Sequence, residues 1–231
     1  MIYKNIIKGE FISRPNRFIA KVKIESEEQT VHVKNTGRCK ELLIKGSTVY
    51  LSVSDNPLRK TKYDLIAVEK KRHNKENLLI NMDSQIPNDA VEEWLKKGNL
   101  FSKNAIIRRE VKYGDSRFDL YIEDEGVKAF LEVKGVTLEN NGIASFPDAP
   151  TIRGIKHINE LIACKNQGFE AYIIFVIQMK QVHKFTPNDI THKAFGDALR
   201  NAQKAGVKIL AFDCHVQENS IEIDSSVKTE L

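Results

Sequence analysis

The chain has 231 residues, of which 41% are hydrophobic and 29% are charged, as is typical of a water-soluble protein with one large domain or two smaller ones. The longest apolar run (residues 171–177) is too short to cross a bilayer and the N-terminus lacks a signal-peptide core, which excludes a membrane protein. The three scattered cysteines form no CxxC pair, which excludes a zinc ribbon and a disulfide framework. A cytoplasmic location is therefore expected. The net charge of +5 is concentrated in residues 1–85, with 17 Lys and Arg against 10 Asp and Glu, which indicates a surface that faces a polyanion, although a solvated lysine-rich surface gives the same counts.

Short strands fill the first 85 residues. In FIAKVKI, residues 18–24, apolar and basic side chains alternate, as they do on a strand with one buried face. TVHV, TVYLSV, DLIAV and LLIN follow at short intervals, with a turn expected at 35–37 and an exposed loop at 70–75. This spacing predicts a small β-barrel or sandwich for residues 1–85.

A helix and three strands open the second region, residues 86–231. Asn88 is expected to cap a helix that Gly98 ends. Strands are expected at 106–113, 117–122 and 127–135. The turn EDEG folds the last two of these strands into a hairpin.

Helices and strands alternate through the remainder. A polar loop is expected at 137–150, and apolar residues at helical spacing predict a helix over 151–166. The run at 171–177 predicts a strand buried on both faces, and a helix over 192–205 and a strand over 207–213 follow. Buried strands joined by a helix pair in parallel, so we expect a mixed sheet flanked by helices. The predicted fold class is α/β, in a two-domain α+β arrangement.

Two carboxylates and a lysine of the predicted hairpin are the candidate catalytic and metal-binding side chains. Glu132 and Lys134 project from one face because side chains alternate along a strand, and folding about EDEG brings Asp119 opposite Glu132. Neighbouring carboxylates repel each other unless a cation lies between them, and oxygen ligands suit Mg²⁺ or Mn²⁺. Lys134 is then placed to orient or deprotonate a water for attack on a phosphodiester. A surface salt bridge among the three residues is the alternative.

The D…ExK pattern, followed by a helix and a strand, resembles the PD-(D/E)XK nuclease superfamily over residues 88–215. The resemblance implies that Asp119 and Glu132 bind the metal and that Lys134 serves the nucleophilic water. It also implies that Glu110, from an upstream element, joins the metal site. The residue before Asp119 is phenylalanine, where the superfamily pattern has proline.

The whole chain is similar to the sugar fermentation stimulation protein (SfsA) family. The segments that carry this similarity are RPNRF (14–18), HVKNTGRCKEL (32–42), RKTKYDLIAV (59–68), YGDSRFD (113–119), LEVKGVTL (131–138) and FPDAPTIRGIKHINEL (146–161). The resemblance implies an N-terminal OB-fold domain, a C-terminal PD-(D/E)XK nuclease-like domain, DNA binding with little sequence preference, and a regulatory link to sugar (maltose) metabolism.

Basic and aromatic side chains of the first domain are candidate nucleic-acid contacts, because OB folds bind nucleic-acid strands with a positive groove and aromatic stacking surfaces. The candidates are Arg14, Arg17, Phe18, Arg38, Lys40, Arg59, Lys60 and Lys62. Taken singly, each basic residue is more simply interpreted as a solvated side chain. In the helix over 151–166, Arg153 and His157 share a face, which either contacts the scissile phosphate or is solvated.

Two functions from different classes are open on this basis. One is a Mg²⁺-dependent nuclease, and the other is a DNA-binding regulator whose nuclease fold no longer cuts. A carbohydrate- or protein-binding module is a third reading, which the basic excess disfavours. The expected partner is DNA, no membrane contact is expected, and a homodimer is compatible with a nuclease of this size.

Overall fold

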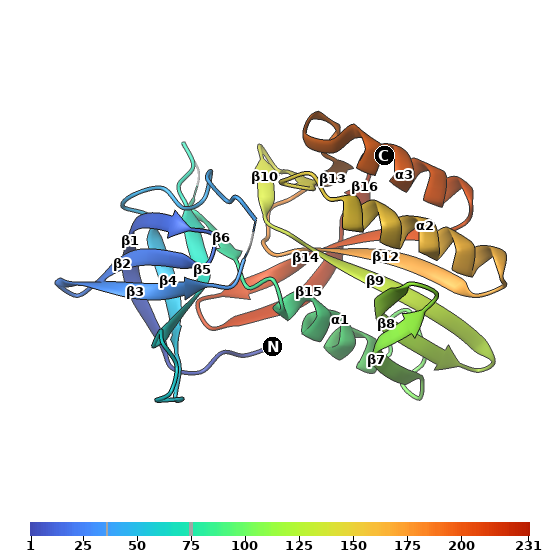
Figure 1. The fold of residues 1–231 in the computed structure, drawn as a ribbon, viewed down its shortest axis with the longest axis horizontal. Coiled ribbons are helices and arrows are strands. Elements are labelled where there is room, and N and C mark those ends of the chain that lie inside the picture. Colours follow the sequence, from blue (N-terminus) through green and yellow to red (C-terminus); the bar gives the residue numbers. More distant parts are fainter. Residues whose placement is uncertain (36, 74–75) are drawn as a thin grey trace.

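The computed structural model describes residues 1–35, 37–73 and 76–231. Residue 36 of the turn expected at 35–37, and residues 74 and 75 of the loop expected at 70–75, lie outside the described residues. Figure 1 shows a β-barrel, formed by the first part of the chain, beside a layered body of helices and strands formed by the rest.

Five strands close the barrel. They are β1 (Ile6–Asn16), β2 (Ile19–Ile24), β3 (Glu27–Val33), β4 (Thr48–Val53) and β5 (Tyr63–Lys70). Antiparallel pairing joins β3, β2, β1, β4 and β5 in that order, and a parallel pairing of β3 with β5 completes the ring. β6 (Leu78–Asn81) pairs antiparallel with β5 and lies outside the ring. The predicted OB-like barrel is confirmed.

The alternation seen in the sequence fills the barrel interior. Ala20 and Val22 of β2 and Val31 and Val33 of β3 are fully buried, while the basic residues between them lie outside. The first strand was not predicted, because its alternation is broken. Its pairing with β2 is irregular at two places, and Pro15 lies within the second of these irregularities.

A six-stranded mixed sheet is the centre of the second body. Its strands are β7 (Ile106–Tyr113), β8 (Ser116–Asp124), β9 (Val127–Val136), β12 (Glu170–Ile177), β14 (Lys208–Gln217) and β15 (Ser220–Ser226). The spatial order is β15-β14-β12-β9-β8-β7, and the central strand β12 runs parallel to both β9 and β14. The parallel pairing expected for the buried run at 171–177 is confirmed.

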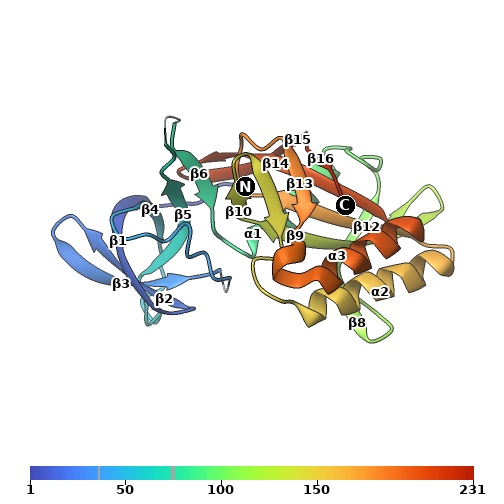
Figure 2. The same cartoon turned by 90° about the horizontal axis from the view of Figure 1, so that it is seen from above.

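Helices cover both faces of this sheet (Figure 1). α2 (Ile152–Asn166) and α3 (Asp189–Lys204) pack on one face, where they run side by side (Figure 2), and α1 (Ile86–Lys96) packs on the other. Among the helices that the structure describes, none is long and apolar enough to span a membrane.

The expectation of a polar loop at 137–150 is wrong, because this segment contains the hairpin strands β10 (Leu138–Asn140) and β11 (Ile143–Phe146). They belong to a second, four-stranded sheet with β13 (Lys184–Pro187) and β16 (Lys228–Thr229). Asn141 and Gly142 both have positive φ, 52° and 81°, as the tight turn of a two-residue hairpin loop requires. The Asn-Gly pair was therefore a hairpin signal.

Two helix starts differ from the expected ones. α1 begins at Ile86 with Pro87 in its first turn, so Asn88 lies inside the helix and does not cap it. α3 begins at Asp189, and the side chain of Asn188 accepts the N–H of Thr191 as its cap. The backbone at His192, where the helix was expected to start, is non-helical and kinks α3.

The two bodies contact each other through several separate connections. The turn of β14 and β15 reaches the barrel (Figure 1), and the N-terminal segment lies along this hairpin, where Tyr3 N–H donates to Asn219 O at 2.7 Å. The N-terminal ammonium donates to Glu93 in α1 at 2.9 Å. Lys70 of β5 forms a buried ion pair with Glu139 of β10, at 2.6 Å.

Candidate active site

The β8–β9 hairpin places Asp119 and Glu132 opposite each other. The last backbone pair of the ladder is Leu120 with Leu131, so the next residues in register are Asp119 and Glu132. Beyond that point the strands separate, and the Asp119 carboxylate accepts the backbone N–H of Val133 at 2.7 Å. The separation leaves room for side-chain chemistry at the end of the ladder.

Asn88, on α1, fixes the second oxygen of Asp119. Its side-chain amide donates to Oδ1 of Asp119 at 2.9 Å, while Oδ2 takes the Val133 N–H. Both carboxylate oxygens therefore have a donor, and the side chain is fixed. Asn88 was expected to cap the helix, so this contact was not predicted.

Glu132 is deeply buried, with 2% of its surface exposed, and its two oxygens differ sharply. Oε1 accepts from the Lys134 ammonium and lies 2.5 Å from Nδ1 of His157. Oε2 is buried and has no hydrogen-bond partner among the residues that the structure describes. A buried carboxylate oxygen without a donor is costly, so this atom calls for an explanation.

The pKa values of the two carboxyls are shifted in opposite directions. Burial, followed by the charge of Glu132, raises the pKa of Asp119. Burial also acts to raise the pKa of Glu132, but the hydrogen bond from His157 and the charge of Lys134 outweigh it and lower that pKa. Glu132 is thus held as the anion, and a second negative charge at Asp119 is disfavoured unless a cation compensates it.

Glu110 is not brought into this cluster. It is exposed on the edge strand β7 with a positive φ of 56°, and its carboxylate lies 3.6 Å from the guanidinium of Arg117. Within residues 1–35, 37–73 and 76–231, no group of three His, Cys, Asp or Glu side chains converges closely enough to hold a metal ion. The two carboxylates of Asp119 and Glu132 are the oxygen donors that the structure brings together at this point.

α2 brings His157 and Arg153 to the same site. Thr151 caps this helix by accepting the N–H of Gly154 at 3.0 Å. His157, one turn further on, is buried with 6% exposure and faces Glu132, so the reading of this face as solvated is wrong for His157. Arg153 is exposed, and its Nε donates to Nε2 of His157 at 3.3 Å. Neither contact left a signal in the sequence beyond the spacing of four.

Two arginines of the barrel are engaged in internal contacts. The Arg14 guanidinium donates to four backbone carbonyls, those of Arg17, Asn35, Gly37 and Arg38, at 2.6–2.9 Å. Arg59 forms a bidentate pair with Asp64 at 2.6 and 2.8 Å. The terminal N–H groups of both guanidiniums thus contact other residues of the barrel.

Other basic candidates are exposed. Arg17, Arg38 and Lys40 surround a cavity of about 290 Å³, whose remaining lining comes from Arg14, Asn16, Gly37 and Leu43. We call this cavity the basic pocket. Phe18, with 51% of its surface exposed, follows Arg17 directly. Lys60 and Lys62 are exposed elsewhere on the barrel, and the Lys62 ammonium lies 5.6 Å from the Tyr63 ring centre.

A second cavity connects the barrel to the second body. Its volume is about 180 Å³, and Gly37 lines both it and the basic pocket. Gly135, the residue after Lys134, lines its far side. The backbone N–H of Arg38 donates to the Asp148 carboxylate across this junction, at 2.8 Å. The barrel loop around Gly37 therefore lies between the basic pocket and the end of the strand that carries Glu132 and Lys134.

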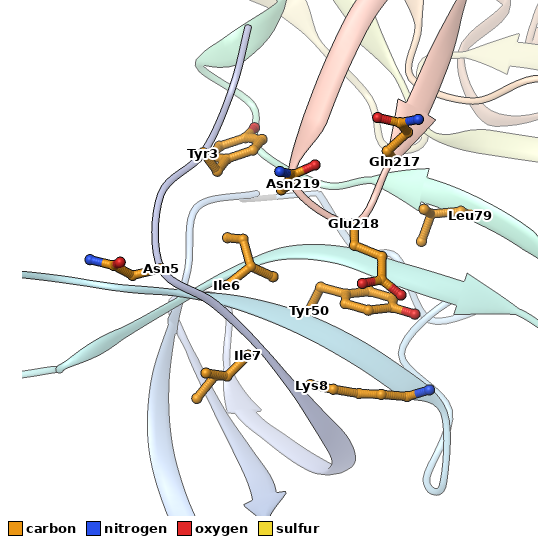
Figure 3. Close-up of a pocket in the computed structure, with 10 residues that line it drawn as sticks. All are labelled: Tyr3, Asn5, Ile6, Ile7, Lys8, Tyr50, Leu79, Gln217, Glu218 and Asn219. Carbon is orange, nitrogen blue, oxygen red and sulfur yellow. The ribbon is translucent and has the colours of Figure 1, made fainter.

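A larger cavity lies elsewhere. It has a volume of about 790 Å³ and lies between β1 and β4 of the barrel and the β14–β15 turn (Figure 3). Glu218 reaches from that turn toward the ring of Tyr50 (Figure 3). The Tyr50 hydroxyl donates to Glu69 at 2.6 Å. None of the site residues predicted from the sequence lines this cavity.

Comparison with known proteins identifies both bodies. Residues 12–79 match the family model described as the SfsA N-terminal OB domain, and residues 85–220 match the one described as the sugar fermentation stimulation protein RE domain. Sugar fermentation stimulation protein homologues of Ruminiclostridium cellulolyticum and Clostridium beijerinckii are each 58% identical to the chain, with 100% of both proteins covered.

A solved structure agrees with these matches. The structure of Pyrococcus furiosus SfsA in complex with Ca²⁺ has a TM-score of 0.88 and 30% sequence identity, and it covers 100% of this chain and 98% of that one. The OB barrel and the mixed sheet with its helices are thus the architecture of a known protein. The chain belongs to the sugar fermentation stimulation protein (SfsA) family.

Proposed function

We propose that this protein binds DNA through its barrel and hydrolyses phosphodiester bonds with a divalent cation, Mg²⁺ or Mn²⁺, held by Asp119 and Glu132. The observation that carries the proposal is the free, buried Oε2 of Glu132 next to a second carboxylate whose pKa is raised. Oxygen donors suit a hard cation that keeps several of its waters. That the Pyrococcus furiosus relative was solved with Ca²⁺, another hard cation, supports this donor chemistry.

The bound ion would polarise the phosphoryl oxygen and compensate the negative charge that develops there. Lys134 is half-buried and its ammonium donates to Oε1 of Glu132, so it is positioned to donate a further hydrogen bond to the attacking water or to the developing oxyanion. Asn88 and the Val133 N–H keep the Asp119 carboxylate in a single orientation. Arg153 is exposed beside these groups and is suited to a phosphate of the substrate.

The proposed DNA contacts are the exposed cations of the basic pocket, Arg17, Arg38 and Lys40, with Phe18 as an exposed aromatic surface for a base. Contacts to phosphates read no sequence and weaken as salt is raised. The loop around Gly37 connects this surface to the Asp119–Glu132 end of the sheet, which supports one nucleic-acid path over both bodies.

A second candidate is a DNA-binding regulator of sugar (maltose) metabolism that does not cut. The observation that favours it is that, in the described part of the chain, no third acidic, histidine or cysteine ligand joins the two carboxylates. Glu110, the expected third ligand, lies beside Arg117 instead.

Cleavage assays separate the two candidates. Labelled single-stranded and double-stranded DNA are incubated with the wild-type protein and Mg²⁺ or Mn²⁺, and with the Glu132→Gln variant as the inactive control. Cation-dependent cleavage by the wild type that Glu132→Gln abolishes would support the nuclease. Salt-sensitive binding of the same DNA with no cleavage by the wild type would support the regulator and rule out the nuclease.

A further inference from the structure

A chain of three side chains connects the protein surface to Glu132. Arg153 Nε donates to Nε2 of His157 at 3.3 Å, and Nδ1 of His157 lies 2.5 Å from Oε1 of Glu132. Arg153 is exposed, whereas His157 and Glu132 are 6% and 2% exposed. The three residues come from α2 and β9, so the chain forms only in the folded protein.

The contacts fix which ring nitrogen of His157 carries the proton in its neutral form. An arginine has only donors, so Nε2, which faces Arg153, must be the acceptor. The hydrogen is then on Nδ1, where it donates to Oε1 of Glu132. Since both nitrogens are engaged, His157 is not itself a ligand for a cation in this arrangement.

This arrangement determines what each oxygen of Glu132 can do. Oε1 is shared by two donors, the Lys134 ammonium and the His157 ring, and so has little capacity left for a cation. Oε2 is buried and free. Rotation of the carboxylate would break both contacts of Oε1, so these two donors together fix the direction in which Oε2 points.

We propose that His157 is a positioning residue that, through its Nδ1–H, holds Glu132 so that Oε2 stays free for the divalent cation, with Arg153 selecting the required ring form. This inference rests on the proposed function. It replaces the sequence-based expectation that His157 contacts the scissile phosphate, because the buried ring faces the carboxylate and both its nitrogens are occupied.

Two substitutions of His157 separate positioning from packing. His157→Asn keeps an N–H donor near the position of Nδ1, whereas His157→Leu keeps bulk and removes the donor. Mn²⁺ binding, measured by calorimetry and by electron paramagnetic resonance without DNA, is expected to weaken by about 10–100-fold in His157→Leu and by clearly less in His157→Asn. A matched control is His32→Leu, which removes a similar histidine–carboxylate contact, His32 with Asp64 at 3.0 Å, in the barrel.

The form of the ring is a separate readout that needs no metal. In ¹⁵N-histidine-labelled wild type, the correlation spectrum of His157 is expected to show a protonated Nδ1 and an unprotonated Nε2. The opposite pattern would overturn the inference, even if the Leu variant does not fold. Equal Mn²⁺ affinity in wild type and His157→Leu, or equal losses in folded His157→Leu and His157→Asn, would also overturn it. A wild type that binds no Mn²⁺ would overturn the proposed cation chemistry as well, which distinguishes the two failures.

Discussion

The carboxylate of Asp119 accepts the backbone N–H of Val133 at 2.7 Å, at the point where the β8–β9 ladder stops. A side chain thus takes the place of a backbone carbonyl in the sheet. The exchange lets the two strands part without leaving the Val133 N–H unsatisfied, and it ties the first candidate ligand to the strand that carries the second.

Replacing Asp119 with asparagine is expected to stabilise the metal-free protein at neutral pH. The pKa of Asp119 is raised by burial and by Glu132, so the folded state holds its proton more tightly than the unfolded state does. Wild-type stability therefore falls as pH rises from the ordinary aspartate pKa to the raised one, and the neutral amide avoids this loss. The oxygen of the new amide can accept the Val133 N–H, and the Asn88 side chain can turn its own oxygen toward the new NH2 group. In EDTA, thermal melting of Asp119→Asn should lie a few degrees above wild type at pH 7, with the gap closing in acid.

Glu132→Gln serves as a control, because its effect on stability at neutral pH should be opposite to that of Asp119→Asn. The folded-state pKa of Glu132 is lowered, so its stabilisation is present above the ordinary glutamate pKa and is lost as pH falls through the folded-state pKa. This variant should melt below wild type at pH 7. A destabilised Asp119→Asn at neutral pH would contradict the destabilising effect that we assign to the buried Asp119 charge beside Glu132.

Lys134→Met is expected to slow DNA cleavage by on the order of 100-fold or more, because it removes a donor placed to stabilise developing charge. Cation binding should weaken much less than cleavage, since both carboxylates and His157, the other donor that holds Oε1 of Glu132, remain. Cleavage of a labelled oligonucleotide and calorimetric Mn²⁺ titration measure the two effects. Loss of Mn²⁺ binding together with cleavage would show that Lys134 acts on the ion site and not on the reaction.

Simultaneous replacement of Arg17, Arg38 and Lys40 by alanine is expected to weaken DNA binding and to reduce its salt dependence. Each lost phosphate contact lowers the slope of log K against log salt by about 0.9 for duplex or about 0.7 for single strands. Fluorescence anisotropy at several salt concentrations measures the slope. The matched control replaces three exposed lysines of the second body, Lys193, Lys204 and Lys228. An equal change in the control would argue against a specific path over the basic pocket.

Arg14→Lys is expected to lower the free energy of unfolding by about 2 kcal/mol, because an ammonium cannot satisfy the four carbonyls that the guanidinium reaches. Urea unfolding measures the change. Arg38→Ala, which removes an exposed side chain from the same loop, should leave stability unchanged. If Arg14→Lys is as stable as wild type, the loop does not depend on these four bonds.

Glu139→Gln is expected to destabilise the protein by about 3 kcal/mol at pH 7, because it leaves the ammonium of Lys70 without its charge partner at a buried position. Burial acts to raise the pKa of Glu139, but the bond from Lys70 outweighs it and lowers that pKa. The gap to wild type should thus be full above the ordinary glutamate pKa and should shrink as pH falls through the folded-state pKa. A gap that is constant with pH would rule out the ion pair as its cause.

Local features carried most of the correct sequence predictions. The approach of Asp119 to Glu132 followed from strand alternation and one short turn, both of which are encoded within twenty residues. The barrel strands other than β1 followed from the sequence pattern, and the buried strand at 171–177 followed from an unbroken apolar run. The hairpin at residues 138–146 was missed although its Asn-Gly pair is a hairpin signal, because the many polar residues of this segment favoured a loop.

The remaining differences depend on tertiary contacts. The sequence does not reveal that Arg14 donates to four carbonyls or that Arg59 pairs with Asp64. A basic cluster has the same composition whether it faces solvent or the loops of its own domain. The partners of Asn88 and His157 lie 31 and 25 residues away in the sequence. Glu110 was expected by analogy, and its place on an exposed edge strand depends on the local backbone, which has positive φ at that residue.

The path of the first three residues limits how the barrel can move. The chain starts on the second body, where the N-terminal ammonium contacts Glu93 and the Tyr3 N–H contacts Asn219, and only then enters the barrel. The barrel is thereby tethered at its entrance as well as at its exit near Ile86. A unit fastened at both ends cannot swivel freely on a single linker, so the basic pocket keeps a nearly constant direction relative to Asp119 and Glu132.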